Sequence, residues 1–274
     1  MPFRLADEHI DQFHTQGYTI FEKVLPPSLI RDLRRVSDRA REVARKEGGP
    51  QVQRLQPVGA HDIDQQPFID YAELPELVDA ISRVLTPRHR HGNRDVFGIL
   101  FEPAERPWST KWHRDERDTF EMDLSAFDKV FDHMDYFNQI NCALYEDGST
   151  WIVPGSHLRR DLPREVSRFP DRPIPEPDFS DRTREEAEVL GLEYCRSLPG
   201  AVRLRLEPGD FALYRSILWH LGNYVPYAPR ATLHDIADTP EFFAWRTEVK
   251  TEMRRRQEAG IPMENPNAPV PSAS

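Results

Sequence analysis

Hydrophobic positions follow a helical period in the first third of the chain. Between residues 29 and 43, behind Pro26 and Pro27, apolar residues recur at steps of three and four, and the same period runs from Pro75 to Leu85. Both stretches predict amphipathic helices with one face against a core. Acidic residues interleave with the arginines on the other face of the first helix, so we interpret that face as a solvated surface.

From residue 95 the pattern changes to short apolar runs separated by Gly, Pro and Asp, which are typical of strands. In the run 202–206 apolar residues alternate with arginines, as expected of a strand with one wet face. The predicted strands are Asp95–Phe101, Asn138–Tyr145, Trp151–Val153, Val202–Leu206, Phe211–Tyr214, Leu218–His220 and Ala231–Ile236. Helices followed by many short strands predict a mainly β fold with flanking helices, and a jelly roll suits the strand count.

This order of elements predicts a single domain over residues 1–258. We expect a helical part over 1–90, a β-core over about 94–238 and a C-terminal helix over about 240–258. Within the core, a helix is predicted near Glu121–Tyr136, and the Pro-rich segment 162–181 is predicted to form a surface loop or lid. Residues 259–274 are predicted to be a disordered tail.

Composition then restricts the class of protein. The 36 basic and 46 acidic residues give a formal charge of −10, which disfavours nucleic acid or an anionic membrane as the partner. No stretch approaches the ~18 apolar residues that cross a bilayer. The N-terminus lacks an apolar signal segment, and two cysteines cannot build a disulfide framework. We therefore expect a soluble, cytoplasmic monomer or homodimer without membrane insertion.

The segment Trp112-His113-Arg114-Asp115 contains two candidate metal ligands. If it is a strand, His113 and Asp115 point to the same face and can converge on one metal. His220, in an aromatic run 105 residues after Asp115, is the candidate third ligand. Two imidazoles and a carboxylate leave three positions open, the arrangement of ferrous oxygenases. Taken alone, a His-X-Asp pair is more often a salt-bridged strand pair.

Other constellations carry less chemistry. His89 and His91 form a possible metal pair, but no suitable glutamate follows them, and we interpret the segment as a loop. A hydrolase triad can be assembled around Ser216 and His220, yet no nucleophile-elbow glycine pattern supports it. We predict that His234 is an ordinary residue of the sheet.

The ordered set of motifs WHRD, DGSTWIVPGSH and LEPGDFALYRSILWH, with Arg230 ten residues after His220, resembles the phytanoyl-CoA dioxygenase (PhyH) family of iron(II)- and 2-oxoglutarate-dependent oxygenases. The opening FHTQGYTIFEKVLPPSLIRDLRR, residues 13–35, is similar to the N-terminal region of that family. The resemblance extends over nearly the whole chain up to about Asp238.

The resemblance implies a double-stranded β-helix core, cupin-like, with iron at one mouth. It implies that Fe(II) is held by His113, Asp115 and His220, and that Arg230 pairs with the distal carboxylate of 2-oxoglutarate. It further implies that the co-substrate is contacted by Thr150, Asn141 and Thr110. The chain departs from the family pattern at Thr110, where many members have glutamine, and at Gly222, where serine is frequent.

The implied reaction uses O2 and 2-oxoglutarate to hydroxylate or otherwise oxidise a C–H bond of a small organic molecule, with release of succinate and CO2. Asp115 indicates a hydroxylase-type enzyme, because related halogenases lack this carboxylate. Desaturation and ring formation stay open. The alternative is a non-catalytic member of the same fold that binds a metal or ligand. A natural-product or lipid-like intermediate is the expected substrate, and nearby aromatic residues predict an apolar pocket: Phe97, Phe101, Trp112 and Trp219.

Overall fold

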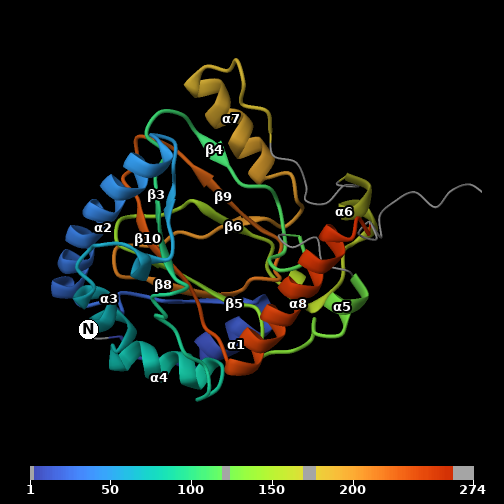
Figure 1. Cartoon of the computed structure of the whole chain (residues 1–274), viewed down its shortest axis with the longest axis horizontal. Coiled ribbons are helices and arrows are strands. Elements are labelled where there is room, and N and C mark those ends of the chain that lie inside the picture. Colours follow the sequence, from blue (N-terminus) through green and yellow to red (C-terminus); the bar gives the residue numbers. More distant parts are fainter. Residues whose placement is uncertain (1–2, 119–123, 169–176, 262–274) are drawn as a thin grey trace, which may run out of the picture.

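Two antiparallel sheets form the centre of the computed structural model, which describes residues 3–118, 124–168 and 177–261 (Figure 1). The larger sheet has the strand order β1 (Tyr18–Phe21), β8 (Phe211–Arg215), β5 (Asn138–Ala143), β10 (Ala231–Ile236), β3 (Gly98–Phe101), β2 (Arg54–Leu55). The smaller sheet has the order β4 (Trp108–Ser109), β9 (His220–Tyr224), β6 (Thr150–Ile152), β7 (Val202–Arg203).

The two sheets pack face to face. Ala143 and Tyr214 of the larger sheet share one buried apolar cluster with Ile152 of the smaller sheet. Successive side chains of a strand point to opposite faces, so β5 and β8 also send Cys142 and Phe211 to the outer face of the larger sheet. Facing antiparallel sheets with flanking helices agree with the fold class predicted from the sequence.

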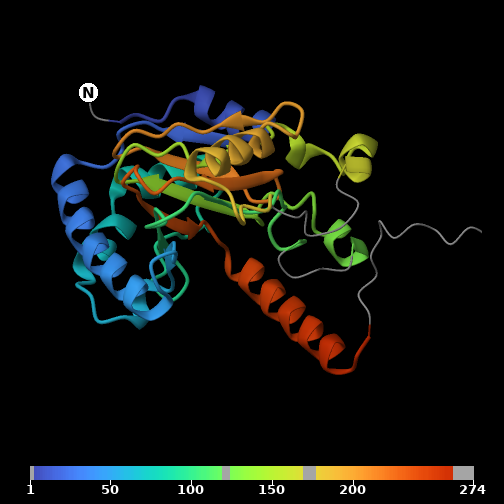
Figure 2. The ribbon, with the colours of Figure 1, turned by 90° about the horizontal axis from the view of Figure 1, so that it is seen from above.

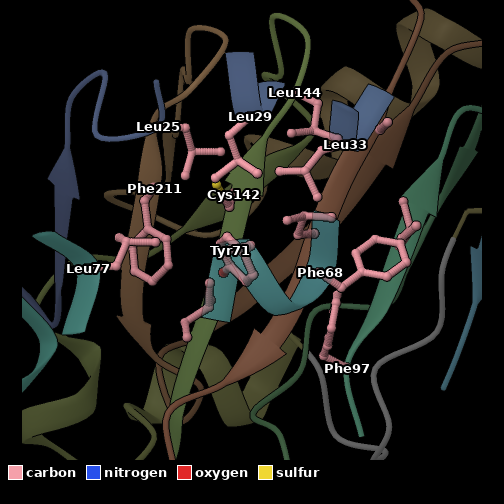
Figure 3. Packing of buried hydrophobic residues seen from close by; sticks show 14 of the residues in the cluster. Leu25, Leu29, Leu33, Phe68, Tyr71, Leu77, Phe97, Cys142, Leu144 and Phe211 are labelled. Atoms are coloured by element: carbon pink, nitrogen blue, oxygen red, sulfur yellow. The ribbon is translucent and has the colours of Figure 1, made fainter. Parts of the chain in front are cut away.

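Helices cover the outer face of the larger sheet. They are α1 (Asp7–Gln16), α2 (Pro27–Gly48), α3 (Gln66–Ala72) and α4 (Pro75–Val84). Figure 3 shows Leu29 and Leu33 of α2 and Tyr71 of α3 around Cys142 and Phe211 of the sheet, all in one buried cluster. A fully buried leucine stabilises the fold by roughly 1.5–3 kcal/mol relative to an exposed one, so these contacts fix the helices on the sheet.

Local sequence sets the limits of α2. Pro27 occupies its first turn, where the missing amide hydrogen would have no partner in any case. The helix ends at Gly49, whose φ of 84° lies in the left-handed region that favours glycine. Between these ends, apolar residues at three- and four-residue steps form the buried face, as the sequence pattern predicts.

The remaining helices lie outside this layer, and one of them, Arg184–Cys195, packs against the outer face of the smaller sheet. They are α5 (Leu124–Asp128), α6 (Pro163–Arg168), α7 (Arg184–Cys195) and α8 (Pro240–Glu258), with short 3-10 turns at Val58–Ala60 and Ser156–Leu158. α8 buries Phe242 near its start and extends away from the sheets (Figure 2). Within the described part of the chain, no helix combines the length and the apolar character that crossing a membrane requires.

Several predicted elements need correction. The strand predicted at Leu218–His220 starts only at His220, because the Leu218 amide donates to the Arg215 carbonyl in a turn. The predicted helix near Glu121–Tyr136 is restricted to α5 in the described residues, and its positions 119–123 lie outside them. The Pro-rich segment 162–181 contains α6 where a loop was predicted, and its positions 169–176 also lie outside the described residues.

The element limits agree best where periodicity is strong. The predicted helices at 29–43 and Pro75–Leu85 correspond to α2 and α4, and the strand Ala231–Ile236 is β10. The C-terminal helix predicted over about 240–258 is α8. Most of the predicted tail, from residue 262 onward, lies outside the described residues. The helices α1, α3 and α7 and the short strands β1, β2 and β4 were not predicted from the sequence.

Candidate metal centre and active site

Two segments far apart in the sequence bring the predicted metal ligands together. His113 and His220 face each other as an isolated antiparallel bridge, with N···O distances of 3.1 and 3.0 Å between their backbones. Asp115 follows in a turn, and its amide donates to the Ser216 carbonyl at 2.9 Å. Residues 112–115 therefore form a bridge and a turn and not a continuous strand, and the three side chains converge nevertheless.

The three side chains form a compact set of candidate metal ligands. One ligand atom from each of His113, Asp115 and His220 lies within 4.8 Å of the other two. The Asp115 carboxylate is 3.3 Å from Nε2 of His113 and 3.6 Å from Nε2 of His220. The centres of the two imidazole rings are 4.1 Å apart. These distances leave one point that all three side chains can reach.

Backbone carbonyls orient both imidazoles. Nδ1 of His113 lies 2.6 Å from the Lys111 carbonyl oxygen, and Nδ1 of His220 lies 2.9 Å from the Leu218 carbonyl oxygen. A protonated Nδ1 donates to such an oxygen and leaves the lone pair of Nε2 for a metal. Nε2 of His220 is buried and has no hydrogen-bond partner among the described residues. Two imidazole nitrogens and a carboxylate, oriented in this way, fit a divalent transition metal.

The electrostatics of the three ligands favour the ionised carboxylate. Burial alone would raise the pKa of Asp115, but the two imidazoles outweigh burial and hold this pKa well below its usual value. Burial would likewise lower the pKa of His113, and Asp115 reverses the direction. The Asp115 carboxylate thus stays anionic between the Nε2 atoms of the two imidazoles.

Arg114, between the two ligands in sequence, fixes their backbone. Its side chain is completely buried, its Nε donates to Asp161 at 3.0 Å and its Nη1 donates to the Ser156 carbonyl at 2.8 Å and to that of Ile217. The guanidinium carbon lies 5.1 Å from the centre of the Trp219 ring. These contacts join the segment of His113 and Asp115 to the turn that follows β6 and to the turn that precedes β9. Sequence analysis missed this role.

A cavity of about 270 Å³, here called the central cavity, contains the three ligands. The same cavity is lined by the residues predicted to contact the co-substrate, which are Thr110, Asn141 and Thr150. Asn141 donates to the Thr150 hydroxyl at 2.9 Å, and Thr110 accepts from the Gly222 amide at 2.7 Å. Thus the structure brings six of the seven predicted site residues into one cavity.

Arg230, the seventh, does not line the central cavity. Its Nε donates to Asp147 at 2.9 Å, and both side chains are at most 5% exposed. Burial lowers the pKa of Arg230, but Asp147 outweighs this effect and the net direction is upward. Arg230 and Asp147 line a second cavity of about 180 Å³. The guanidinium carbon lies 4.7 Å from the ring centre of Tyr224, which borders both cavities.

Tyr224 gives a physical reason for Gly222. A Cβ atom at position 222 would collide with the hydroxyl and ring of Tyr224. The side chain of Tyr224 therefore fills the space that a serine at position 222 would need. The glycine is a signal in the sequence, but the residue that requires it lies two positions away on the same strand face.

The wall of the central cavity is more polar than predicted. Phe97 and Phe101 belong to the core under the helices, and Trp112 and Trp219 belong to a separate buried cluster. None of these four aromatic residues lines the cavity, so the predicted apolar pocket is wrong. The apolar lining of the central cavity includes Phe137, Ile236 and Phe242. Its polar lining includes six residues that were not selected from the sequence: Arg54, Gln56, Gln139, His234, Glu116 and Arg246.

Charged side chains lie at two places along the cavity. Arg54, on the edge strand β2, lines it without a side-chain partner among the described residues. Glu116 and Arg246 of α8 pair there at 2.9 Å. Burial raises the pKa of Glu116 to about 7, against the opposite effect of Arg246. The backbone of Glu116 has a φ of 64°, in the left-handed region, directly after the ligand Asp115.

The family model of phytanoyl-CoA dioxygenase (PhyH) matches residues 13–223 of the chain. Similar solved structures include HygX from Streptomyces hygroscopicus with nickel and 2-oxoglutarate bound, with 16% identity and a TM-score of 0.57 over 86% of this chain and 88% of that chain. AviO1 from Streptomyces viridochromogenes Tue57 has 16% identity and a TM-score of 0.55 over 85% of this chain and 95% of that chain.

EctD from S. alaskensis with bound Fe has 15% identity and a TM-score of 0.53, over 86% of this chain and 77% of that chain. At such identities the likeness concerns the fold, and it agrees with a jelly-roll core. No curated protein matches the chain.

Proposed function

The chain belongs to the phytanoyl-CoA dioxygenase family, and from this premise we propose that it is an Fe(II)- and 2-oxoglutarate-dependent oxygenase acting on a small organic molecule. The observation that carries the proposal is the convergence of His113, Asp115 and His220, with both Nδ1 atoms tied to backbone carbonyls. A salt-bridged strand pair would explain His113 and Asp115, but it would not explain a second imidazole, whose buried Nε2 lies 3.6 Å from the same carboxylate.

In the proposed enzyme the three side chains would hold Fe(II) through two Nε2 atoms and the Asp115 carboxylate. When bound, iron and 2-oxoglutarate supply the oxidation by O2, with succinate and CO2 as by-products and a C–H bond of the substrate as the target. The protein contributes orientation and exclusion of water. Arg114, completely buried, keeps the two ligands of its segment in register with His220.

The co-substrate is proposed to lie along the wall that carries Asn141 and Thr150. The Thr150 hydroxyl accepts from Asn141, so its own proton remains available to a carboxylate oxygen. Positive charge for the distal carboxylate comes from Arg54, which has no side-chain partner among the described residues, and from Arg230 behind Tyr224. Nη1 of Arg230 is buried without a partner in the described part of the chain. This unused donor supports a contribution of Arg230 to binding of the distal carboxylate.

We expect the oxidation to be hydroxylase-type. Asp115 occupies the ligand position that must be vacant for halide in the related halogenases, and the two imidazoles hold the pKa of this half-buried carboxylate well below its usual value. Hydroxylation, desaturation and ring formation all begin with removal of a hydrogen from the substrate, and the choice among them depends on the substrate.

Anaerobic binding and turnover test this function in two steps. We expect the purified protein to bind Fe(II) and 2-oxoglutarate without oxygen, and to form succinate when oxygen is admitted. His113→Ala should abolish both metal binding and succinate formation, whereas the exposed His133→Ala should change neither. Protein that binds neither Fe(II) nor 2-oxoglutarate would refute the proposal. Binding of both without succinate, in the presence of candidate substrates, would favour the non-catalytic alternative.

A further inference from the structure

Four polar side chains on the wall of the central cavity form one chain of hydrogen bonds. Nε2 of Gln139 lies 3.0 Å from Nε2 of His234, and Nδ1 of His234 lies 2.8 Å from Oδ1 of Asn141. Nδ2 of Asn141 donates to the Thr150 hydroxyl at 2.9 Å. At the far end, Oε1 of Gln139 is buried and has no partner among the described residues. His234 is thus part of this chain and not an ordinary residue of the sheet.

Strand register places the four residues. Gln139 and Asn141 are two apart on β5, so they share the inner face of the larger sheet. His234 on β10 is paired directly with Asn141. Thr150 belongs to the smaller sheet, where it pairs with Gly222, two residues after the ligand His220. The chain of hydrogen bonds therefore crosses from the larger sheet to the smaller one beside the candidate metal centre.

The direction of the donors along this chain decides which atom Gln139 has left over. Burial holds the pKa of His234 well below its usual value, so its ring is neutral and has one donor and one acceptor nitrogen. The Oδ1 atom of Asn141 can only accept, so the proton of the bond belongs to Nδ1 of His234; Nε2 of His234 must then accept, and Gln139 uses its amide N–H there. The amide oxygen of Gln139 remains as an unmet acceptor.

The two ends of the chain suit different molecules. The Thr150 hydroxyl offers a proton, which matches the carboxylate oxygens of 2-oxoglutarate. The Gln139 oxygen offers only lone pairs, and 2-oxoglutarate as a dianion has no donor to give it. An unmet buried acceptor costs about 1–3 kcal/mol. A ligand that brings a donor removes this cost, and Arg54, a cation on the same cavity whose charge helps to lower the pKa of His234, favours a neutral hydroxyl over an ammonium.

We propose that Gln139 is a specificity-determining residue that accepts a hydrogen bond from a hydroxyl group of the substrate, and that the chain through His234 and Asn141 to Thr150 sets it as an acceptor. The inference rests on the proposed function, because that function puts the co-substrate beside Thr150. It makes the substrate a hydroxyl-bearing molecule and not a purely hydrocarbon one.

The tautomer of His234 tests the donor direction along the hydrogen bonds without any turnover. The full-length protein is labelled with 15N at histidine and loaded with Zn(II) and 2-oxoglutarate. Long-range 1H–15N correlation then gives the tautomer, and the variant His234→Asn assigns the signal. We expect a neutral ring protonated at Nδ1. A ring protonated at Nε2 would overturn the inference. Failure of Zn(II) and 2-oxoglutarate to bind would instead overturn the proposed function, so the two failures are distinguishable.

Matched alcohols and methyl ethers test the substrate class. The probes are cyclohexanol against methoxycyclohexane and benzyl alcohol against benzyl methyl ether, with affinity for the same loaded protein measured by ligand-observed NMR. The wild type should bind each alcohol about tenfold more tightly than its ether, as one added hydrogen bond predicts.

Two glutamine variants locate the preference. Gln139→Leu should bring the ratio of affinities close to one. Gln56→Leu, which removes an amide from the same cavity but not from the chain, should keep it. Equal or undetectable binding of alcohol and ether to the wild type would overturn the assignment of a hydroxyl. An unchanged ratio in Gln139→Leu would overturn the role of Gln139.

Discussion

Replacing Arg114 by methionine tests whether this residue joins the metal-ligand segment to the rest of the fold. Arg114 is 0% exposed, and the substitution keeps most of the side-chain volume while it removes every donor. The carbonyls of Ser156 and Ile217 would lose their partner, and among the residues that the structure describes Asp161 would retain only Arg117, at 2.8 Å. Burial lowers the pKa of Arg114 to about 10, so the side chain is still charged at neutral pH and its ion pair is intact.

The expected loss follows from burial. We expect a loss of about 3–5 kcal/mol, because the buried Ser156 and Ile217 carbonyls lose their donor and Asp161 loses one of its two arginine partners. For a chain of this length, that loss lowers Tm by roughly 10 °C. Affinity for the metal should also fall, by roughly 10–100-fold, as is typical when groups that orient metal ligands are removed.

Urea unfolding followed by tryptophan fluorescence measures the effect as a change in midpoint at constant slope. Arg39→Met is the matched control: Arg39 is 63% exposed and paired only with an exposed glutamate, so its loss should cost less than about 0.5 kcal/mol. If Arg114→Met and Arg39→Met unfold within about 1 kcal/mol of each other, the structural role assigned to Arg114 is wrong.

Three further predictions concern other buried groups. Asp147→Ala should lower the free energy of unfolding by about 3–5 kcal/mol in urea melts, because it leaves Arg230 buried and unpaired; a loss below about 1 kcal/mol would contradict the ion pair. Burial raises the pKa of Asp238 from 3.8 to about 8, so wild-type stability is lost as pH rises through this window. Asp238→Asn should therefore gain stability relative to wild type between pH 5 and pH 9 by roughly 1 kcal/mol or more, and a pH-independent difference in unfolding midpoint would disprove the buried neutral carboxyl. Gly222→Ala should destabilise the protein by about 1–3 kcal/mol through its collision with Tyr224, and Tyr224→Leu in the same chain should recover part of that loss; strict additivity of the two changes would speak against the collision.

Much of the site could be predicted because its signals are local. The spacing of His113 and Asp115 and the motif that contains His220 point to the candidate ligand set without any knowledge of the strands. The aromatic neighbours misled for a related reason. Trp112 and Trp219 precede the ligand histidines directly, and adjacent residues in an extended segment point to opposite sides, so both lie behind the site.

Contacts over long sequence separations could not be predicted in this way. The partner of Arg230 is Asp147, 83 residues earlier, and no local pattern distinguishes it among 46 acidic residues. Gln139 and His234 are unremarkable in the sequence, and their role depends on the pairing of β5 with β10. The fold class followed from periodicity, whereas short strands such as β2 depend on their neighbours and leave little pattern in the sequence.

The bridge between His113 and His220 has a consequence for the kinetics of the backbone. Each ligand residue donates its amide proton to the carbonyl of the other, so the same two residues that would hold the metal also protect each other from solvent. Such an isolated pair opens locally more readily than a long ladder. An ion that binds both imidazoles would couple this opening to its own release. The hydrogen-exchange rate of these two amides would then fall as the metal concentration rises. This rate would measure the fraction of protein molecules in which the centre holds a metal.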